Sequence, residues 1–233
     1  MTRESYDSRV TTKAPARCTG GVPTQTFWNL SDGKRMRVRR AAVEEFASHP
    51  FADANLDRIA RAARVPKGSL YQYFADKDDL YAYAVESGMA EAKALFDETM
   101  TRRPPRDAFD LYLRALIFPL TLRRQQPALA RLYARSTLAA PPGQSTAARH
   151  HNAMFQAQFF GWGVQTRTIA SDIDREAAGF LLDAVSNRLH TILLDEGTTK
   201  RKGREPSPVT LATKVVELLR RAFAPGPDEE AAS

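Results

Sequence analysis

The chain has 233 residues, of which 43% are hydrophobic and 26% are charged, a balance typical of a soluble globular protein with one or two domains. Its single cysteine, Cys18, excludes an internal disulfide, and no cysteine or histidine spacing indicates a zinc site. The N-terminus lacks the apolar core of a signal peptide, and no uncharged stretch could span a bilayer. We therefore expect a cytoplasmic protein that uses no metal and no cofactor.

Charge is distributed unevenly along the chain. Residues 1–77 carry 14 Lys and Arg against 8 Asp and Glu, whereas residues 78–233 carry 20 against 19, so the first third holds nearly all of the formal net charge of +7. A local basic excess suits binding to a polyanion such as DNA or to an anionic membrane. A solvated basic face would carry the same excess, and charge alone does not separate these interpretations.

Helical periodicity begins after the first 25 residues. Residues 1–25 are rich in Thr, Ser, Pro and Gly and predict a disordered arm. A helix is predicted over about 31–48, and it ends before Pro50 because the residue before a proline resists helical geometry. Asn55 is a favourable N-cap for a second helix. The apolar residues of that helix recur at i, i+3, i+4 and i+7: Leu56, Ile59, Ala60 and Ala63.

Seven more helices are predicted along the rest of the chain. A short third helix covers residues 67–73, and a fourth begins at Asp76-Lys77 and extends to about Met100. Beyond Pro104-Pro105 the pattern predicts helices near 106–123, 127–138, 144–163, 172–196 and 207–223. Because neither a strand nor an internal repeat is indicated, the predicted fold class is all-α.

Residues 59–74 carry the pattern with the most functional information. Successive helical residues turn by about 100°, so Leu70 and Phe74 point the same way, toward Ile59 and Ala63. The opposite face presents Gly68, Ser69 and Gln72, with Lys67 at its N-terminal end. Tyr71 and Tyr73 flank this face on either side. A short helix that is held by two apolar anchors suits entry into the major groove of DNA.

The side chains on this face have chemical uses on DNA. Gly68 lets the backbone approach the phosphates, and Gln72 can form paired hydrogen bonds with an adenine edge. Four others can hold phosphates, which sets the register without reading sequence: Lys67, Tyr71, Tyr73 and Lys77. The alternative is a small helical hairpin with surface tyrosines, and the spacing favours a helix-turn-helix over it.

The stretch from Val38 to Val85 resembles the DNA-binding domain of TetR/AcrR-type transcriptional regulators. The resemblance rests on Ala42, Phe46, Ile59, Ala60, Ala63, Val65, Lys67, Gly68, Ser69, Leu70, Tyr71, Tyr73, Phe74, Lys77 and Leu80. It implies a three-helix helix-turn-helix domain at 26–76 and a larger helical dimerisation and ligand-binding domain at 77–225. The sequence after Pro225 separately predicts a disordered tail at 226–233. The predicted DNA-contacting set is Asn55, Arg64, Lys67, Gly68, Ser69, Tyr71, Gln72, Tyr73 and Lys77.

Two residues depart from the family pattern at the turn. Arg64 stands where these proteins usually have glycine, in a position that often takes a left-handed conformation, which costs another residue about 1 kcal/mol. Its guanidinium can compensate by reaching a phosphate. Pro66 stands where they usually have Ser or Thr, so a cap hydroxyl worth about 1 kcal/mol is lost. Proline is nevertheless well tolerated at the start of a helix.

Two apolar stripes near the C-terminus predict a dimer interface. The helices near 172–196 and 207–223 could pack against their copies in a second subunit as a four-helix bundle. Burial within the monomer is the alternative, and the family resemblance favours the dimer. The predicted interface residues are Leu181, Val185, Leu189, Ile192, Val215 and Leu219.

Aromatic residues gather between positions 96 and 180, with a few polar groups among them. An aromatic chamber with sparse polar groups suits a hydrophobic effector, although aromatics at helical spacing are more often core. The predicted ligand-binding residues are Phe118, Tyr133, Phe155, Phe159, Trp162, Asp183 and Asn187. A metal site at His150-His151 is disfavoured because adjacent helical residues point about 100° apart.

Two other functional classes fit the sequence less well. No nucleophile elbow, phosphate loop or matched acid–base pair indicates an enzyme. A membrane-surface helix would need bulky apolar residues opposite its basic face, and the first helix offers small Val and Ala instead. The sequence therefore predicts a ligand-released repressor that binds a palindromic duplex operator as a homodimer. The fourth helix joins both domains and is expected to transmit the signal.

Overall fold

The computed structural model describes residues 23–138, 146–194 and 207–226, and every regular element in these ranges is helical. The elements are α1 (Gln25–Trp28), α2 (Asp32–Ser48), the 3-10 helix η1 (Phe51–Asp53), α3 (Leu56–Ala63), α4 (Lys67–Tyr73), α5 (Lys77–Arg102), α6 (Ala108–Gln125), α7 (Pro127–Leu138), α8 (Thr146–Gln165), α9 (Arg175–Leu194) and α10 (Pro208–Phe223). The all-α prediction is confirmed. Most of the expected arm, Cys18, the tail after Gly226 and the side chains of His150 and His151 lie outside the described residues.

Side-chain caps explain why several helices begin where they do. Oδ1 of Asn55 accepts the N–H of Asp57 at 2.7 Å at the start of α3. Equivalent bonds start three later helices: Asp76 caps α5, Asp107 caps α6 and Ser207 caps α10. Each such cap satisfies an N–H without a helical partner and contributes about 1 kcal/mol.

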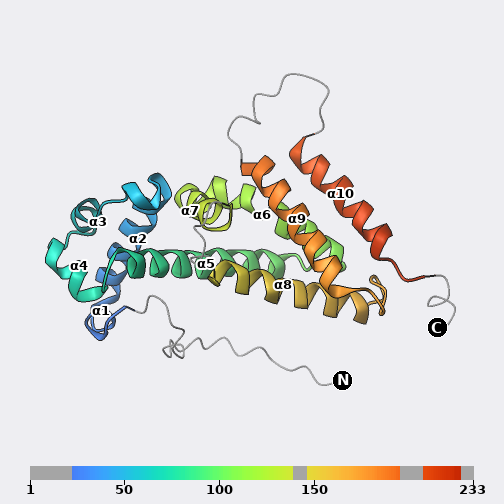
Figure 1. The fold of residues 1–233 in the computed structure, drawn as a ribbon, viewed down its shortest axis with the longest axis horizontal. Helices are drawn as coiled ribbons and strands as arrows, with labels where there is room; N and C mark the ends of the chain where they lie inside the picture. The colour runs from blue at the N-terminus through green and yellow to red at the C-terminus, as the bar shows by residue number, and fades with distance from the viewer. Residues whose placement is uncertain (1–22, 139–145, 195–206, 227–233) are drawn as a thin grey trace.

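The first four helices and the start of α5 form a separate body at one end of the molecule (Figure 1). Its core combines residues from each of these helices, including Phe27, Phe46, Ile59, Leu70 and Leu80, all at most 2% exposed. The apolar face predicted for α3 is buried, since Ile59, Ala60 and Ala63 are each at most 3% exposed. This packing fixes the direction in which α4 presents its other face.

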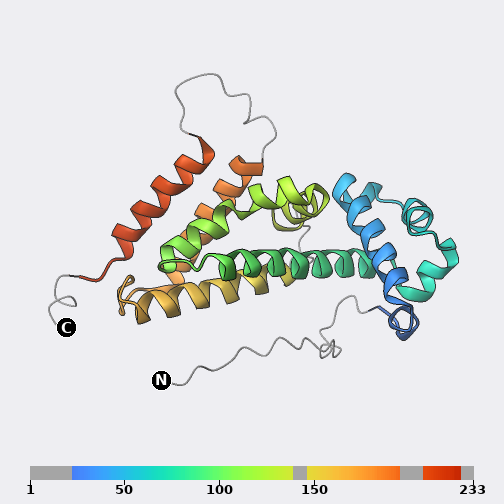
Figure 2. The same ribbon diagram turned by 180° about the vertical axis from the view of Figure 1, so that it is seen from behind.

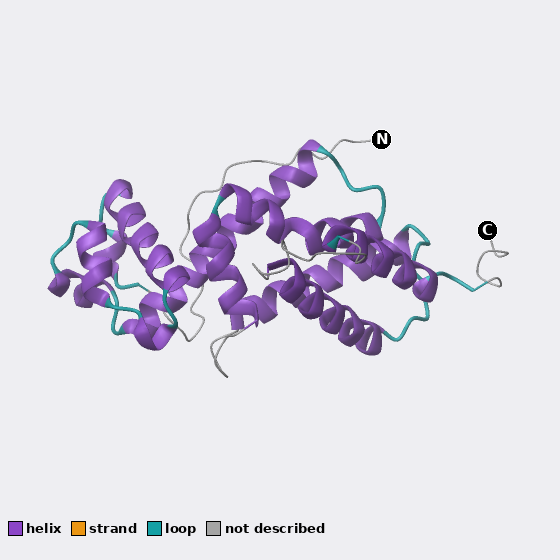
Figure 3. Cartoon of the chain, turned by 90° about the horizontal axis from the view of Figure 1, so that it is seen from above, coloured by secondary structure: helices purple, strands orange, loops and turns teal. Residues whose placement is uncertain are grey.

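The 26-residue helix α5 runs from this body into the larger domain (Figure 2). A second core lies among α6, α8, α9 and α10, and it includes Phe109, Phe159, Leu182 and Val216. A smaller cluster joins α5, α6 and α7 through Ala92, Leu122, Leu129 and Ala130. Seen from above, the four N-terminal helices are set apart from the rest of the molecule (Figure 3). No helix among the described residues has the length and hydropathy to span a membrane.

Helix α7 connects the two bodies a second time. Its Leu132 is 1% exposed and belongs to the core of the N-terminal body, although α7 follows α6 in the chain. At the crossing with α5, a Cβ atom on Gly88 would lie 2.9 Å from Cδ1 of Leu129, so glycine permits the close approach. Both α5 and α7 therefore join the N-terminal body to the larger domain.

Candidate nucleic-acid interface

The turn between α3 and α4 has the geometry expected of a helix-turn-helix. Arg64 ends α3 with φ 57° and ψ 49°, the left-handed conformation predicted for it, and its N–H bonds to the carbonyls of Ala60 and Arg61. Pro66 is extended, with φ −60° and ψ 144°, and immediately precedes the first residue of α4. Val65 is buried between the two helices. The turn is thus short, anchored at its centre and exposed at Arg64.

Helix α4 is anchored on one side and free on the other. Leu70 and Phe74 are each 2% exposed and lie in the core, as predicted. On the outer face Gly68 and Gln72 are exposed, and Tyr71 is 53% exposed. This face could meet an external partner without rearrangement of the core.

Two of the predicted phosphate-binding side chains have partners within the chain. The Nζ atom of Lys67 donates to Oδ2 of Asp57 at 2.8 Å, and this hydrogen bond raises the pKa of Lys67. The Nζ atom of Lys77 donates to the carbonyl of Ala52 at 3.0 Å and lies 4.8 Å from the ring centroid of Phe51. These lysines would have to exchange a protein partner for a phosphate.

The placement of Tyr73 corrects the expectation that its side chain lies on the DNA-facing surface. The residue is 3% exposed, and its ring lies 5.9 Å from that of Phe27, between centroids. Its position on α4 turns it toward α1 rather than outward. Tyr73 therefore serves the core of the domain, and Tyr71 remains the exposed tyrosine of this helix.

Helix α1 was not predicted, and it braces α4. The N–H of Thr24 donates to the carbonyl of Tyr73 at 2.9 Å, and its hydroxyl donates to the carbonyl of Gln72 at 2.6 Å. Phe27 is 0% exposed and packs between the ring of Tyr73 on α4 and that of Tyr83 on α5. The adjacent aromatic pair Phe27-Trp28, directly after the predicted arm, was the available signal, because disordered segments contain few aromatic residues.

An ion-pair network holds α3 against α2. Glu45 is 7% exposed and accepts from Nε and Nη2 of Arg58 and from the N–H of Asn55. Burial opposes ionisation of Glu45, but the hydrogen bonds from Arg58 and Asn55 outweigh it and leave the pKa of the carboxyl lowered. The backbone of Asn55 is thereby fixed by the core carboxylate, while its side chain caps α3.

Additional basic side chains surround the turn. Arg37 on α2 is exposed, and its Nε donates to the carbonyl of Ala63 at 3.3 Å, next to Arg64. Arg61 is exposed on α3 nearby in sequence. The prediction did not include Arg37 because only the packing of α2 on α3 brings it to the turn.

The expected ligand-binding residues do not line one chamber. Phe159 is 0% exposed in the second core, with Phe155 and Trp162 packed against it. Phe118 and Tyr133 pack instead against the cluster of α5, α6 and α7. Of the two polar residues, Asp183 accepts from Nε2 of Gln156, and Asn187 is exposed. The rings of the second core are in edge or tilted contact, as in a filled interior.

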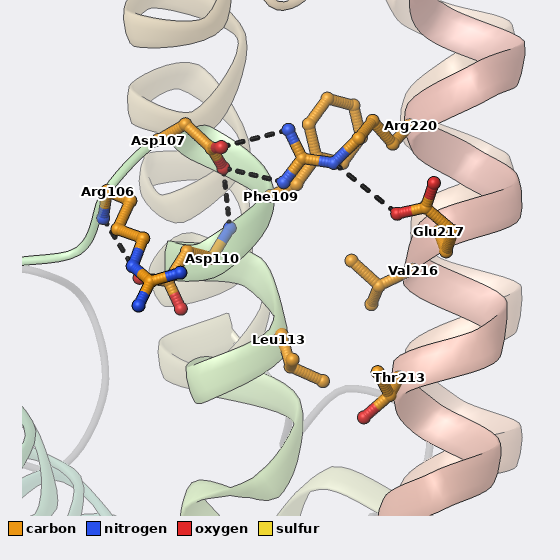
Figure 4. Close-up of a pocket in the computed structure, with 9 residues that line it drawn as sticks. All are labelled: Arg106, Asp107, Phe109, Asp110, Leu113, Thr213, Val216, Glu217 and Arg220. Atoms are coloured by element: carbon orange, nitrogen blue, oxygen red, sulfur yellow. Dashed lines mark hydrogen bonds and ion pairs between the residues drawn. The ribbon is translucent and has the colours of Figure 1, made fainter.

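A cavity of about 200 Å³ lies between α6 and α10, and no predicted ligand-binding residue lines it (Figure 4). Asp107 binds Arg220 through two hydrogen bonds of 2.9 and 3.0 Å, and the guanidinium lies 4.8 Å from the ring centroid of Phe109. The carboxylate of Asp110 is taken up by Arg114. Because these charges are paired within the chain, the cavity offers a ligand little beyond a small apolar floor.

The predicted dimer-interface residues divide into two groups. Leu189 and Leu219 are 4% and 5% exposed and belong to the second core, which corrects the expectation that they face a partner. Leu181 is 41% exposed. Val185, Ile192 and Val215 are half-buried. The predicted interface therefore includes residues that belong to the core of the subunit as well as residues that are free to face a partner.

Comparison with known proteins identifies the class of this site. Residues 38–84 match the model of the family described as "Bacterial regulatory proteins, tetR family". An HTH-type transcriptional repressor of Streptomyces coelicolor is 40% identical over 60 residues, which cover 26% of this chain and 31% of that protein. A putative mycofactocin biosynthesis transcriptional regulator of Mycobacterium tuberculosis is 35% identical over 78 residues, covering 34% and 39% of the two chains. The matches thus span less than two fifths of these relatives.

Solved structures extend the similarity over the whole fold. A TetR family transcriptional regulator from Chloroflexus aurantiacus has a TM-score of 0.59 and 26% identity, covering 87% of this chain and 99% of its own. The regulator FadR from Bacillus subtilis, in complex with stearoyl-CoA, has a TM-score of 0.63 and 18% identity, covering 81% and 98%. The α3–α4 unit is a DNA-binding helix-turn-helix, and the similar proteins are regulators rather than enzymes. The N-terminal unit thus matches the tetR family of bacterial regulatory proteins, and the described chain shares the fold of a solved TetR family regulator.

Proposed function

We propose that this regulator is a repressor that binds a palindromic operator as a homodimer in the bacterial cytoplasm and is released by a hydrophobic small molecule. The outer face of α4 carries the DNA-binding part. A Cβ atom on Gly68 would meet nothing within 4 Å, so packing inside the chain does not require glycine there. Close approach of an external backbone such as DNA does explain it. The exposed Gln72 then reaches base edges and Tyr71 reaches phosphates.

Selection from random duplex DNA tests this proposal. The expected result is an enriched, roughly palindromic site whose affinity falls steeply with salt. Lys67→Ala should weaken binding to all sequences and reduce the salt slope by about one. Gln72→Ala should instead relax the preference at one base position, at a cost of about 1–3 kcal/mol. Recovery of no enriched site would refute sequence-specific binding.

The dimer part of the proposal is supported by a second apolar seam on α10. One seam is buried in the subunit: Ala212, Val216, Leu219 and Phe223. One residue earlier in each turn lie Leu211, Val215, Leu218 and Ala222, with the same spacing of four, three and four residues. Leu218 is 64% exposed, and on α9 Leu181 and Phe180 are 41% and 78% exposed. Pairing with a second copy would cover this seam.

Two adjacent leucines give a matched test of the interface. Leu218→Glu places a charge on the outer seam, so we expect a folded monomer in sedimentation and weaker operator binding. Leu219→Glu places the same charge in the core of the subunit and should lower the unfolding temperature, because a buried unpaired charge is costly. A wild-type chain that sediments as a monomer at micromolar concentration would contradict the proposal, as would a Leu218→Glu variant that remains dimeric.

Ligand-dependent release is supported by the connections between the two bodies. Arg39 on α2 forms an ion pair with Glu91 on α5 and donates to the carbonyl of Ser87. Arg131 on α7 approaches Glu44 on α2 at 3.8 Å. A shift of α5 or α7 would therefore move α2 and, through the shared core, α4. The solved regulator that holds stearoyl-CoA shares this fold, which supports a larger domain that can accommodate an apolar ligand.

A further inference from the structure

His190 on α9 has a buried ring nitrogen that no other group uses. Its Nε2 atom is screened from solvent and has no hydrogen-bond partner among the described residues. The ring also bonds to the main chain of Leu116 on α6, in a hydrogen bond that raises the pKa of the histidine. A bond with that effect donates to a carbonyl. Since Nε2 is free, Nδ1 must be the donor to the Leu116 carbonyl.

The protonation state of His190 follows from its surroundings. Burial lowers its pKa to about 4, and the bond to Leu116 only partly opposes this shift. No charged side chain among the described residues contributes to the shift. At neutral pH the imidazole is therefore uncharged, with its proton on Nδ1 and a lone pair on Nε2. The side chain offers one acceptor and no free donor.

The acceptor lies in a mainly apolar junction of α6, α7 and α9. The ring of Tyr133 on α7 meets that of His190 edge-on, with centroids 6.1 Å apart. Leu189 and Leu193 are buried on either side of it along α9. Helix α6 contains the buried Pro119, which has no N–H to give to the carbonyl four residues earlier. This irregular turn lies directly after the Leu116 that orients His190.

Among the described residues, nearby polar groups have hydrogen-bond partners, whereas Nε2 of His190 has none. The hydroxyl of Tyr112 bonds to Ser186 at 3.0 Å and to the carbonyl of Leu182 at 3.1 Å. The guanidinium of Arg123 donates to the carbonyl of Leu193 at 3.4 Å. Buried polar atoms in native proteins are seldom left without a partner, because each costs about 1–3 kcal/mol. An open acceptor in this region therefore calls for a donor from outside the described residues, such as a bound ligand.

We infer that Nε2 of His190 is the hydrogen-bond acceptor of the effector site, and that it selects uncharged, largely apolar ligands carrying a hydroxyl or N–H donor. A carboxylate placed here would set an anion against an acceptor lone pair in apolar surroundings, without a compensating charge. Hydrogen-bonding sites discriminate strongly against ligands that lack the matching group. The inference rests on the proposed function only for the consequence of binding, which is release of DNA.

Binding of 2-naphthol and 2-naphthoate to the full chain at pH 7.5 tests this inference. The two probes share an aromatic body, but one carries a donor hydroxyl and the other an anion. We expect 2-naphthol to bind at least tenfold more tightly, and to shift the 15N resonance of Nε2 of His190 in histidine-labelled protein. His190→Phe keeps a ring of similar size without the acceptor and should weaken 2-naphthol binding about tenfold. His49→Gln, on the N-terminal body, is the control and should change neither value.

Several results would overturn the inference. They are equal affinity for the two probes, an Nε2 resonance that 2-naphthol leaves unmoved, unchanged 2-naphthol affinity in His190→Phe, and no binding of 2-naphthol at millimolar concentration. The resonance is measured on wild-type protein, so the test holds even if the variant fails to fold. A gel shift on the same samples separates the two proposals: 2-naphthol binding without release of operator DNA would support the acceptor site and reject ligand-controlled release.

Discussion

Lys67 shows how one residue can serve two partners in turn. Its ammonium is held by Asp57 in the free chain, although it begins the helix that presents the DNA-facing surface. Both side chains are about half exposed, so the pair contributes little to stability. The ion pair matters for DNA binding, because Asp57 competes with phosphate for Lys67. Asp57 also places a negative charge beside the proposed DNA surface.

Removal of that charge is expected to strengthen DNA binding. Asp57→Asn should free Lys67 and tighten binding to all duplexes several-fold, with a salt slope steeper by about one. Fluorescence anisotropy over a salt series measures both. Glu98→Gln, which removes a charge of the same sign from α5 and breaks an exposed pair with Arg102, is the control. An Asp57→Asn variant with wild-type affinity at every salt concentration would show that the pair does not restrain Lys67.

His190 predicts a pH dependence of stability. Its pKa is about 4 in the folded chain against an ordinary value of 6.5, so the unfolded chain binds more protons between these values. Stability from this residue is complete above pH 6.5 and is lost as the pH falls toward 4, by about 3 kcal/mol in total. Urea unfolding at pH 7.5, 6 and 5 should show the wild type losing stability relative to His190→Phe as the pH falls. Parallel curves would mean that His190 titrates normally.

Helix α1, which was not predicted from the sequence, has a clear structural role. It is a single turn, too short to be stable alone, and owes its existence to Phe27 in the core and to the bonds from Thr24 to the end of α4. By packing against α4 and α5 it helps to hold the recognition helix in place.

The Phe27→Ala variant is expected to loosen α4. Loss of a fully buried phenylalanine should cost about 3–5 kcal/mol of unfolding free energy and weaken operator binding. The adjacent Trp28 is 40% exposed, so Trp28→Ala should cost less and serves as the control. Hydrogen exchange at the amides of α4 would report the loosening directly. Unchanged protection of α4 in Phe27→Ala would show that α1 is dispensable for its position.

For the molecule as a whole, the shared core means that the two bodies are not independent. Leu132 lies in the core of the N-terminal body, with Ala128 and Tyr133 packed against the same core, while α7 also contacts α5, α6 and α9. The fourth predicted helix, α5, does join both bodies as expected, and α7 is a second connection that the sequence did not reveal.

Calorimetry of two leucine variants tests this coupling. Leu132→Ala should destabilise the N-terminal body by about 2–5 kcal/mol and separate a single wild-type transition into two. Leu116→Ala removes an equally buried leucine that belongs to the second core alone. It should lower the unfolding temperature without separating the transition of the N-terminal body from that of the larger domain. Two separate transitions in the wild-type protein would contradict the coupling.

Local pattern was enough to locate most helices and the DNA-binding unit. Apolar periodicity, the Asn55 cap and the prolines at 50 and 66 act within a few residues, and α2 to α5 begin within a residue of their predicted positions. The left-handed conformation of Arg64 was expected from the family resemblance, since related proteins usually have glycine at this position of the turn. These features are determined by short-range sterics and hydrogen bonding.

Only the tertiary structure could show which residues distant in sequence contact one another. The side chain that meets Lys67, Lys77 or Tyr73 depends on how α1, η1 and α3 pack, and no local rule specifies it. On α10, the two seams differ by one residue, about 100° of rotation, so composition alone could not tell inner Leu219 from outer Leu218. The sequence by itself determined the helices and the class of protein. Packing decided which side chains remain free to act, because exposure is a property of the assembled helices.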